Sequence, residues 1–410
     1  MSGGVFLGLD VGTTRTKAVL VDGDGRALAT ASAPTPVMRD ASGDGRDRRD
    51  PAAVLDVLVA LIRELGREHA IDTVRGVSLA SVGEELVYLD ANGQATGPVP
   101  CWYVEQAASA DPLAPPHRLA GWYALRALAA AGDAVLDRAV SFTDLGSHLL
   151  QRLTDTAAPA MDLSHASRTG MLSRDAVEWS AAALAATGAG RLVPPALVHS
   201  GEELGRLSPA AASLTGIPAG IPVVAGGHDH LCAAFAAGTR ETGDVFVSVG
   251  TSESQLLITA EPWETLAVRE DEGVEVGFFV DGVHRYVHAA QPSGRRVAEL
   301  LEAAGATSAD LPALYGRMEA GAADDALAAD LLTELTRQAE SAAALTERLA
   351  AVARTAPERL RAGGAPVAFA LWRRLREERA RVPLQFVQTP ELAGVGAALL
   401  AAGRGAEVAA

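Results

Sequence analysis

The sequence predicts an α/β protein with two domains and a largely parallel or mixed sheet. Apolar segments of strand length alternate with segments whose apolar residues recur at helical spacing, which is typical of this fold class. The length of 410 residues favours two domains. In each half an apolar strand ends in a Gly-Thr turn, at Gly12 and at Gly250. A change of composition at residues 236–244 predicts that the domains are residues 1–238 and 239–410.

The first part of the chain predicts a sheet that is followed by a helix. Asp50 and Pro51 are typical of a helix start, and apolar residues at helical spacing continue to Leu65. The polar, charge-dense segment 39–49 is predicted to be a loop. The predicted strands of this part are a hairpin over residues 5–22 and single strands over residues 26–32, 74–80 and 86–89.

The rest of the chain contains fewer strands and more helix. Gly394 and Gly396 lie in a segment rich in small residues, which predicts a helix that packs closely against a neighbour. The predicted strands are residues 221–227 and 245–249, residues 112–153 are predicted to be mostly helical, and further helices are predicted over 326–360, 366–372 and 392–402.

Composition excludes several classes of partner. The net charge of −16 argues against nucleic acid and anionic membranes, which bind basic patches. No segment reaches the roughly 20 apolar residues of a membrane span, and the first residues do not form a signal peptide. The two cysteines, Cys101 and Cys232, belong to no metal-binding motif and fit a reducing compartment. A cytoplasmic protein is therefore expected.

The turn of the first hairpin has the residue types of a phosphate-binding loop. Gly12, Thr13 and Thr14 can offer backbone N–H groups and hydroxyls to a phosphate chain. Asp10 ends the first strand, where its carboxylate can hold a hydrated Mg²⁺ beside those phosphates. A hairpin with an ordinary polar turn is the alternative interpretation, because short glycine motifs often match by accident.

A similar turn follows the strand at residues 245–249. Gly250, Thr251 and Ser252 repeat the combination of a glycine with two hydroxyl residues. Two such turns, one in each half of the chain, predict that a polyphosphate is held from both sides of a cleft.

Asp229 follows an apolar strand and two glycines, and we expect it to face the cleft. A carboxylate in that position can accept the proton of a hydroxyl that attacks a γ-phosphoryl group. His228 and His230 flank this aspartate and would share one face of a strand, so a metal site is a second interpretation. A third is that both histidines satisfy buried hydrogen bonds.

Four blocks of sequence carry a resemblance to a known family. The blocks are LDVGTTRTK at 9–17; MDLSHASRTG at 161–170 with Trp179; Gly205, TGIPAGIPV at 215–223 and GGHD at 226–229; and GGA at 363–365 with Trp372, Glu391 and GVGAALL at 394–400. In this order they resemble the FGGY family of carbohydrate kinases, within the actin-like ATPase superfamily.

The resemblance implies a two-domain actin-like (ribonuclease H-like) ATPase fold with a cleft between the domains. It also implies ATP-dependent phosphorylation of a sugar, ketose or polyol, with Mg²⁺. By the same resemblance, Asp10 holds Mg²⁺; Asp229 is the general base; Gly12, Thr13, Thr14, Lys17, Gly250, Thr251 and Ser252 contact the phosphates; Gly363 and Gly364 lie against the adenosine; and Glu84, Trp102, His228 and Asp229 contact the sugar.

Two features depart from the family pattern. Val104 and Gln106 stand where aspartate and arginine are usual, so part of a polar clamp on the sugar is absent. A proline-rich loop with Gly-Glu-Arg has no counterpart between residues 294 and 326, so the second domain is expected to be shortened. The alternative function is therefore a sugar- or nucleotide-binding protein with little catalysis, and a metal-dependent hydrolase built on residues 228–230 is a third. The sequence does not name the sugar, and family habit alone suggests a homodimer.

Overall fold

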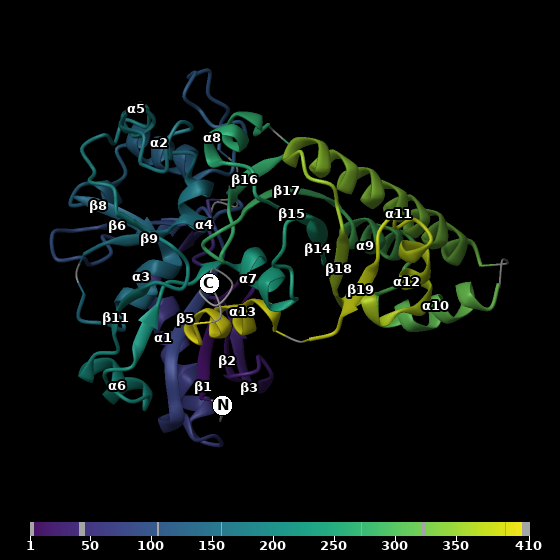
Figure 1. Cartoon of the computed structure of the whole chain (residues 1–410), viewed down its shortest axis with the longest axis horizontal. Helices are drawn as coiled ribbons and strands as arrows, with labels where there is room; N and C mark the ends of the chain where they lie inside the picture. Colours follow the sequence, from purple (N-terminus) through teal and green to yellow (C-terminus); the bar gives the residue numbers. More distant parts are fainter. Residues whose placement is uncertain are drawn as a thin grey trace.

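The computed structural model describes residues 4–40, 46–104, 106–156, 158–271, 273–321, 325–389 and 391–403. Its frame is a pair of mixed β-sheets, one from each half of the chain (Figure 1). In spatial order, the strands of the first sheet are β11 (Glu203–Arg206), β12 (Pro222–Val224), β5 (Val74–Ser81), β1 (Val5–Val11), β2 (Arg15–Asp22) and β3 (Ala27–Pro34), and β13 (Gly227–His228) also pairs with β5.

The second sheet repeats the plan of the first. In spatial order, its strands are β16 (Glu275–Phe278), β17 (Arg285–Pro292), β15 (Ser252–Thr259), β14 (Asp244–Val249), β18 (Arg359–Gly364) and β19 (Leu384–Val387). In each sheet three neighbouring strands pair antiparallel, β1, β2 and β3 in the first and β14, β15 and β17 in the second, and the first of the three pairs parallel with a strand that comes later in the chain. The predicted α/β class with mixed sheets is confirmed.

Small two-stranded sheets and helices surround these two sheets. The small sheets pair β4 (Arg48–Arg49) with β7 (Val99–Pro100), β6 (Leu86–Leu89) with β8 (Ser141–Asp144), and β9 (Ala160–Asp162) with β10 (Ala196–Val198). The helices are α1 (Pro51–Leu65), α2 (Gly121–Ala131), α3 (Leu145–Gln151), α4 (Leu163–Ala166), α5 (Ala181–Ala186), α6 (Pro209–Thr215), α7 (Asp229–Ala236), α8 (Trp263–Leu266), α9 (Gly294–Ala303), α10 (Leu311–Glu319), α11 (Ala326–Ala353), α12 (Ala370–Glu377) and α13 (Leu392–Ala401).

The helix start predicted at Asp50 is confirmed. The Asp50 side chain accepts a hydrogen bond from the backbone N–H of Ala52 at 3.0 Å, as an N-cap does. Leu58 and Ile62 lie on the buried face of α1, which packs against β2 and β3. This helix therefore covers one face of the first sheet.

The C-terminal helix α13 returns to the first sheet (Figure 1). It packs against β1, β5 and α7, as its small residues predict. A Cβ on Gly8 would lie 1.8 Å from the carbonyl oxygen of Gly394, and a Cβ on Gly396 would lie 2.0 Å from that of Cys232. Only glycine permits so close an approach of two backbones. The division of the chain at residue 238 stays a prediction.

Four segments differ from their predicted structure. Residues 112–153, predicted to be mostly helical, also contain the strand β8, which pairs with β6. Residues 221–227 are two short strands, because the chain at Gly226 passes so close to β5 that a Cβ would lie 1.7 Å from Leu79 O. Helix α11 ends at Arg354, which has a positive φ of 49°, and β18 follows it. The predicted loop at 39–49 ends in β4, and its residues 41–45 lie outside the described residues. These strands are defined by distant partners and not by local patterns.

Among the described residues, no helix combines the length and the apolar character needed to cross a membrane. The longest, α11, carries Asp330, Glu334, Arg337, Glu340 and Glu347 along its length.

The close packing of α13 gives a test of the fold. We expect Gly396→Ala to lower the free energy of unfolding by about 1–3 kcal/mol, because the added methyl overlaps the Cys232 carbonyl. The matched control is Gly316→Ala in α10, where a Cβ meets nothing within 4 Å. The control should stabilise the protein by about 0.5–1 kcal/mol through helix propensity. Urea unfolding measures both; equal effects of the two variants would contradict this packing.

Candidate active site

Three cavities adjoin one another between the two halves of the chain. The histidine cavity, about 190 Å³, is lined by residues that include Thr13, Asp229 and His288. The hairpin cavity, about 340 Å³, shares Thr13 and Asp229 and continues to Asp10 and Lys17. The β18 cavity, about 740 Å³, shares Asp10 and Lys17 and extends to the end of β18. The shared residues make the three cavities one continuous path.

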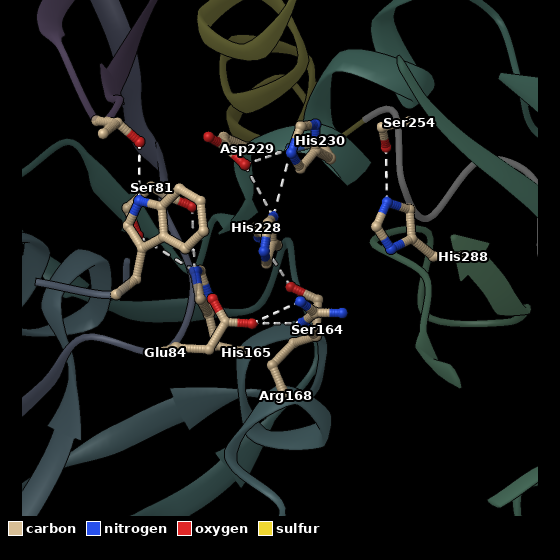
Figure 2. Close-up of polar contacts among 12 residues, drawn as sticks. Ser81, Glu84, Ser164, His165, Arg168, His228, Asp229, His230, Ser254 and His288 are labelled. Atoms are coloured by element: carbon tan, nitrogen blue, oxygen red, sulfur yellow. Dashed lines mark hydrogen bonds and ion pairs between the residues drawn. The ribbon is translucent and has the colours of Figure 1, made fainter. Parts of the chain in front are cut away.

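Asp229 lines both the histidine cavity and the hairpin cavity, and Figure 2 shows its contacts with His228 and His230. It is the first residue of α7, directly after β13. Its Oδ1 accepts a hydrogen bond from the backbone N–H of His230 at 2.7 Å and lies 2.9 Å from Nδ1 of His228. Burial raises the pKa of Asp229, but His230 and His228 hold it below its ordinary value. The carboxylate is therefore ionised at neutral pH and can accept a proton.

Four histidine rings are stacked through this region. The ring centroids of His165, His228, His230 and His288 are separated by 5.8, 5.5 and 6.0 Å in that order. The prediction that His228 and His230 share a strand face is wrong, because α7 begins at Asp229 and places His230 in a helix. Burial lowers the pKa of His230 to about 4, so this ring is uncharged at neutral pH.

The residues at 228–230 do not form a metal cluster in the described part of the chain. Among the described residues, the group whose ligand atoms lie close enough together to hold a metal ion is a different one: Asp144, Asp162 and His165, all buried. Nδ1 of His165 lies 2.5 Å from Asp162 Oδ2. Burial lowers the pKa of His165, but Asp162 and Asp144 raise it to about 10, so this cluster holds a buried ion pair between the His165 imidazolium and Asp162. The geometry gives no support to a hydrolase built on residues 228–230.

Asp10 and Lys17 face each other across the first hairpin. Lys17 Nζ lies 3.5 Å from Asp10 Oδ2 and 2.6 Å from Glu391 Oε2, at the start of α13. Burial raises the pKa of Asp10 to about 7; Lys17 opposes this effect, and the charges of Asp229 and Glu391 add to it. An oxygen ligand with uncompensated negative charge around it suits Mg²⁺, so these residues fit that ion.

The first hairpin turn lines the hairpin cavity with Gly12, Thr13 and Thr14. The backbone N–H of Gly12 closes the turn by donating to Arg15 O at 3.1 Å. The hydroxyl of Thr13 accepts a hydrogen bond from Nε1 of Trp102 at 2.8 Å. This contact ties the turn to the wall of the histidine cavity, which Trp102 also lines.

A buried ion pair holds the residue that follows the second turn, Gly250 to Ser252. Ser252 lines the histidine cavity, whereas Gly250 and Thr251 are exposed. The next residue, Glu253, is fully buried and binds Arg376 at 3.0 and 2.5 Å. A buried carboxylate that has lost its cation is strongly unfavourable, so this pair fixes the start of β15.

The end of β18 forms the far end of the path. Gly363 and Gly364 line the β18 cavity together with Phe246 and Ser248 from β14. Gly364 has a φ of 121°, and a Cβ there would lie 2.1 Å from Val249 O, so only glycine fits.

The wall of the histidine cavity opposite the aspartate is a charged network. Arg168, on η3 (Ser167–Thr169), donates from Nε to Glu84 Oε1 at 2.7 Å and also binds Glu275 of β16. Glu84 holds a positive φ of 64°, a conformation that costs about 1–3 kcal/mol outside glycine. His288 and Ser254 complete this wall from β17 and β15.

The sequence departures lie beside the cavity. Gln106 donates from Nε2 to the backbone oxygen of Val104 at 3.0 Å, so its side chain turns back on its own segment. Of this segment, Trp102 lines the histidine cavity and Val104 and Gln106 do not.

Comparison with known proteins places this geometry in a family. The model of the FGGY family of carbohydrate kinases, N-terminal domain, matches residues 5–111 and 126–236, which is more than half of the chain. The chain belongs to the FGGY family of carbohydrate kinases. It is 28% identical to L-fuculokinase of Escherichia coli K12 over 283 residues, and 26% identical to xylulose kinase of Klebsiella pneumoniae over 265 residues. The matches cover 65% and 60% of this chain, but only 56% and 53% of those relatives.

Solved structures of the FGGY type share the fold over nearly the whole chain. A xylulose kinase from Brucella ovis superposes with a TM-score of 0.85 at 21% identity, covering 98% of this chain and 91% of that one. Glycerol kinase from Plasmodium falciparum, solved with ADP, gives a TM-score of 0.82 at 13% identity, covering 98% and 90%. The predicted actin-like fold is confirmed.

Reasoning from the sequence missed most of the wall that β15, β16 and β17 give to the histidine cavity. Ser254, Glu275, Tyr286 and His288 line the histidine cavity but belong to no block of the FGGY resemblance. Arg168 lies within a resembling block and was not expected to reach the site. The alternation of residues along a strand can show which side chains share a face of the sheet. It cannot show that this face packs against η3, which carries Arg168.

The raised pKa of Asp10 predicts a pH dependence of stability. The pKa is about 7 in the folded protein against an ordinary value of 3.8. Between pH 3.8 and about 7 the folded protein keeps the proton on Asp10, whereas the unfolded chain loses it. The free energy of unfolding therefore falls as the pH rises through this range. Without Mg²⁺, Asp10→Asn should be more stable than the wild type by a few kcal/mol at pH 8, and this advantage should fall to less than half at pH 5. Thermal unfolding with EDTA measures this difference, with Asp56→Asn on the exposed face of α1 as the control. A difference that does not change with pH would contradict the assignment.

Proposed function

We propose that this protein transfers the γ-phosphoryl group of ATP to a hydroxyl of a sugar, ketose or polyol. The observation that carries the proposal is the position of Asp229, which lines both the histidine cavity and the hairpin cavity. A group that accepts the acceptor's proton has to lie between the acceptor and the phosphates. The kinase names of the relatives agree with this chemistry.

In this proposal the acceptor lies in the histidine cavity and donates its reacting hydroxyl to Asp229. The low pKa of Asp229 keeps the carboxylate ionised, so it orients the hydroxyl and takes the proton as the phosphoryl group is transferred. Glu84, Trp102 and His228 supply the surrounding walls. Because phosphoryl transfer needs mostly positioning and charge neutralisation, one ionised carboxylate suffices as the base.

The nucleotide occupies the other two cavities. Lys17 and the turn at Gly12, Thr13 and Thr14 contact the phosphates from the first half. The second turn, Gly250 to Ser252, lines neither of these two cavities; Ser252 lines the histidine cavity, so this turn contacts the phosphates only where they reach that cavity beside Asp229. Gly363 and Gly364 form the wall beside the adenosine, and a Cβ on Gly364 would collide with the backbone of β14 at Val249. Asp10 holds Mg²⁺, which neutralises phosphate charge when it is bound. The raised pKa of Asp10 fits a site that binds a cation.

A second candidate function is binding without efficient turnover. Gln106 turns back on its own segment, and neither Val104 nor Gln106 lines the histidine cavity, so this segment leaves part of a polar clamp on the sugar absent. Under this alternative ATP and sugar bind, but ADP is not released.

Release of ADP with a panel of sugars, ketoses and polyols tests the proposal. We expect turnover with at least one uncharged acceptor, and a loss of kcat of about 100-fold or more in Asp229→Asn. ATP binding to this variant, measured by calorimetry, should stay close to that of the wild type. Asp56→Asn controls for the loss of a carboxylate elsewhere. Binding of ATP and sugar with no turnover in the wild type would favour the second candidate, and an unchanged rate in Asp229→Asn would remove the base from the proposal.

A further inference from the structure

A chain of three hydrogen-bonded side chains enters the histidine cavity from the C-terminal half. The hydroxyl of Ser254 lies 2.6 Å from Nε2 of His288, and Nδ1 of the same ring lies 2.7 Å from Oε2 of Glu275 (Figure 2 shows the first contact). The strand register explains the alignment. Glu275 and His288 are directly paired between β16 and β17, and Ser254 lies two residues from the partner of His288 on β15.

The charge on Glu275 determines which atoms donate hydrogen bonds in this chain of side chains, which we call the relay. Burial raises the pKa of Glu275, but Arg168 and the hydrogen bond with His288 hold it well below its ordinary value. An ionised carboxylate only accepts, so Nδ1 of His288 carries the hydrogen. With the ring hydrogen on Nδ1, Nε2 accepts the hydroxyl hydrogen of Ser254. The Ser254 oxygen is left with lone pairs, which can receive a hydroxyl hydrogen from a bound molecule.

The rest of the cavity disfavours an anionic occupant. Among the described residues that line it, Arg168 is the only lysine or arginine. Glu84 and Glu275 already bind its guanidinium. Asp229 adds a third carboxylate, and His230 is uncharged at neutral pH. A carboxylate or phosphate on the acceptor would therefore enter a negative cavity with no free lysine or arginine.

The size of the cavity limits the acceptor further. At about 190 Å³ it has the room of roughly six water molecules. That space suits one small polyhydroxyl molecule.

We propose that Ser254, held by His288 and Glu275, is a second anchor for the acceptor, which binds as an uncharged polyhydroxyl molecule of monosaccharide size. Asp229 takes the hydroxyl that is phosphorylated, and Ser254 receives the hydrogen of another hydroxyl. Ser254 is a specificity-determining residue, and His288 and Glu275 position it. The inference rests on the proposed function for the identity of the site, but binding tests it without turnover.

Acceptor binding and ADP release are measured with ketoses, aldoses and polyols, and with the aldonates of the same sugars. With an uncharged acceptor that binds, Ser254→Ala and His288→Ala should weaken binding and raise the acceptor KM about tenfold, with a smaller change in kcat and an unchanged KM for ATP. His288→Gln keeps an acceptor atom near the Ser254 hydroxyl and should recover part of the loss. His284→Gln, on the same β17 hairpin but outside the cavity, is the control for removing a histidine.

The outcomes separate this anchor from the kinase proposal. If uncharged sugars bind without ADP release, and bind more weakly to Ser254→Ala than to the wild type, the anchor is supported and the kinase proposal is rejected. If the protein turns over an acceptor, and Ser254→Ala and His288→Ala change the acceptor KM by less than twofold, the anchor is overturned and the kinase proposal stands. Aldonates that bind as well as their uncharged parents, or no binding by any sugar, also overturn it. Thermal unfolding of each variant shows whether it is folded, and Glu275→Gln, which removes the charge and not the shape, gives a second variant for the same relay.

Discussion

The close packing of α13 against β1 and α7 is the constraint on which the site depends. Gly394 lies against Gly8 of β1, and Gly396 lies against Cys232 of α7. These contacts fix the end of β1, which carries Asp10, relative to the start of α7, which carries Asp229. At its own start, α13 brings Glu391 to Lys17. One helix of small residues therefore sets the relative positions of Asp229, Asp10 and Lys17, the residues proposed as the base, the Mg²⁺ ligand and a phosphate contact.

Negative charge governs the chemistry of the cleft. Asp10, Asp229, Glu84 and Glu275 all lie in or beside the connected cavities. The protein divides them by environment. Asp229 is held ionised by its histidine neighbours, Glu84 and Glu275 are neutralised by Arg168, and Asp10 has a raised pKa that a cation would relieve. This division gives similar carboxylates different roles, and it makes the acceptor side unfavourable for anions.

The sequence predicted the parts of the site that depend on local patterns. The strand ends at Asp10 and at residue 249, the N-cap at Asp50 and the close-packing helix with Gly394 were all readable from neighbouring residues. It did not predict that residues 221–227 divide into the two strands β12 and β13, because the break at Gly226 comes from the close approach of its backbone to Leu79 of β5. The relay from Glu275 to Ser254 was also missed. That relay depends on the register of three strands and on the docking of η3 against β16, and neither leaves a pattern within one segment.

The most direct test of the central claim is a crystal structure with Mg²⁺ and a non-hydrolysable ATP analogue. Our account predicts that the adenosine lies in the β18 cavity beside Gly363 and Gly364, with the phosphates beside Lys17 in the hairpin cavity. The γ-phosphoryl group should point toward Asp229, with room for one acceptor hydroxyl between them, within about 3 Å of the carboxylate. A nucleotide bound outside this path, or a γ-phosphoryl group directed away from Asp229, would contradict the account.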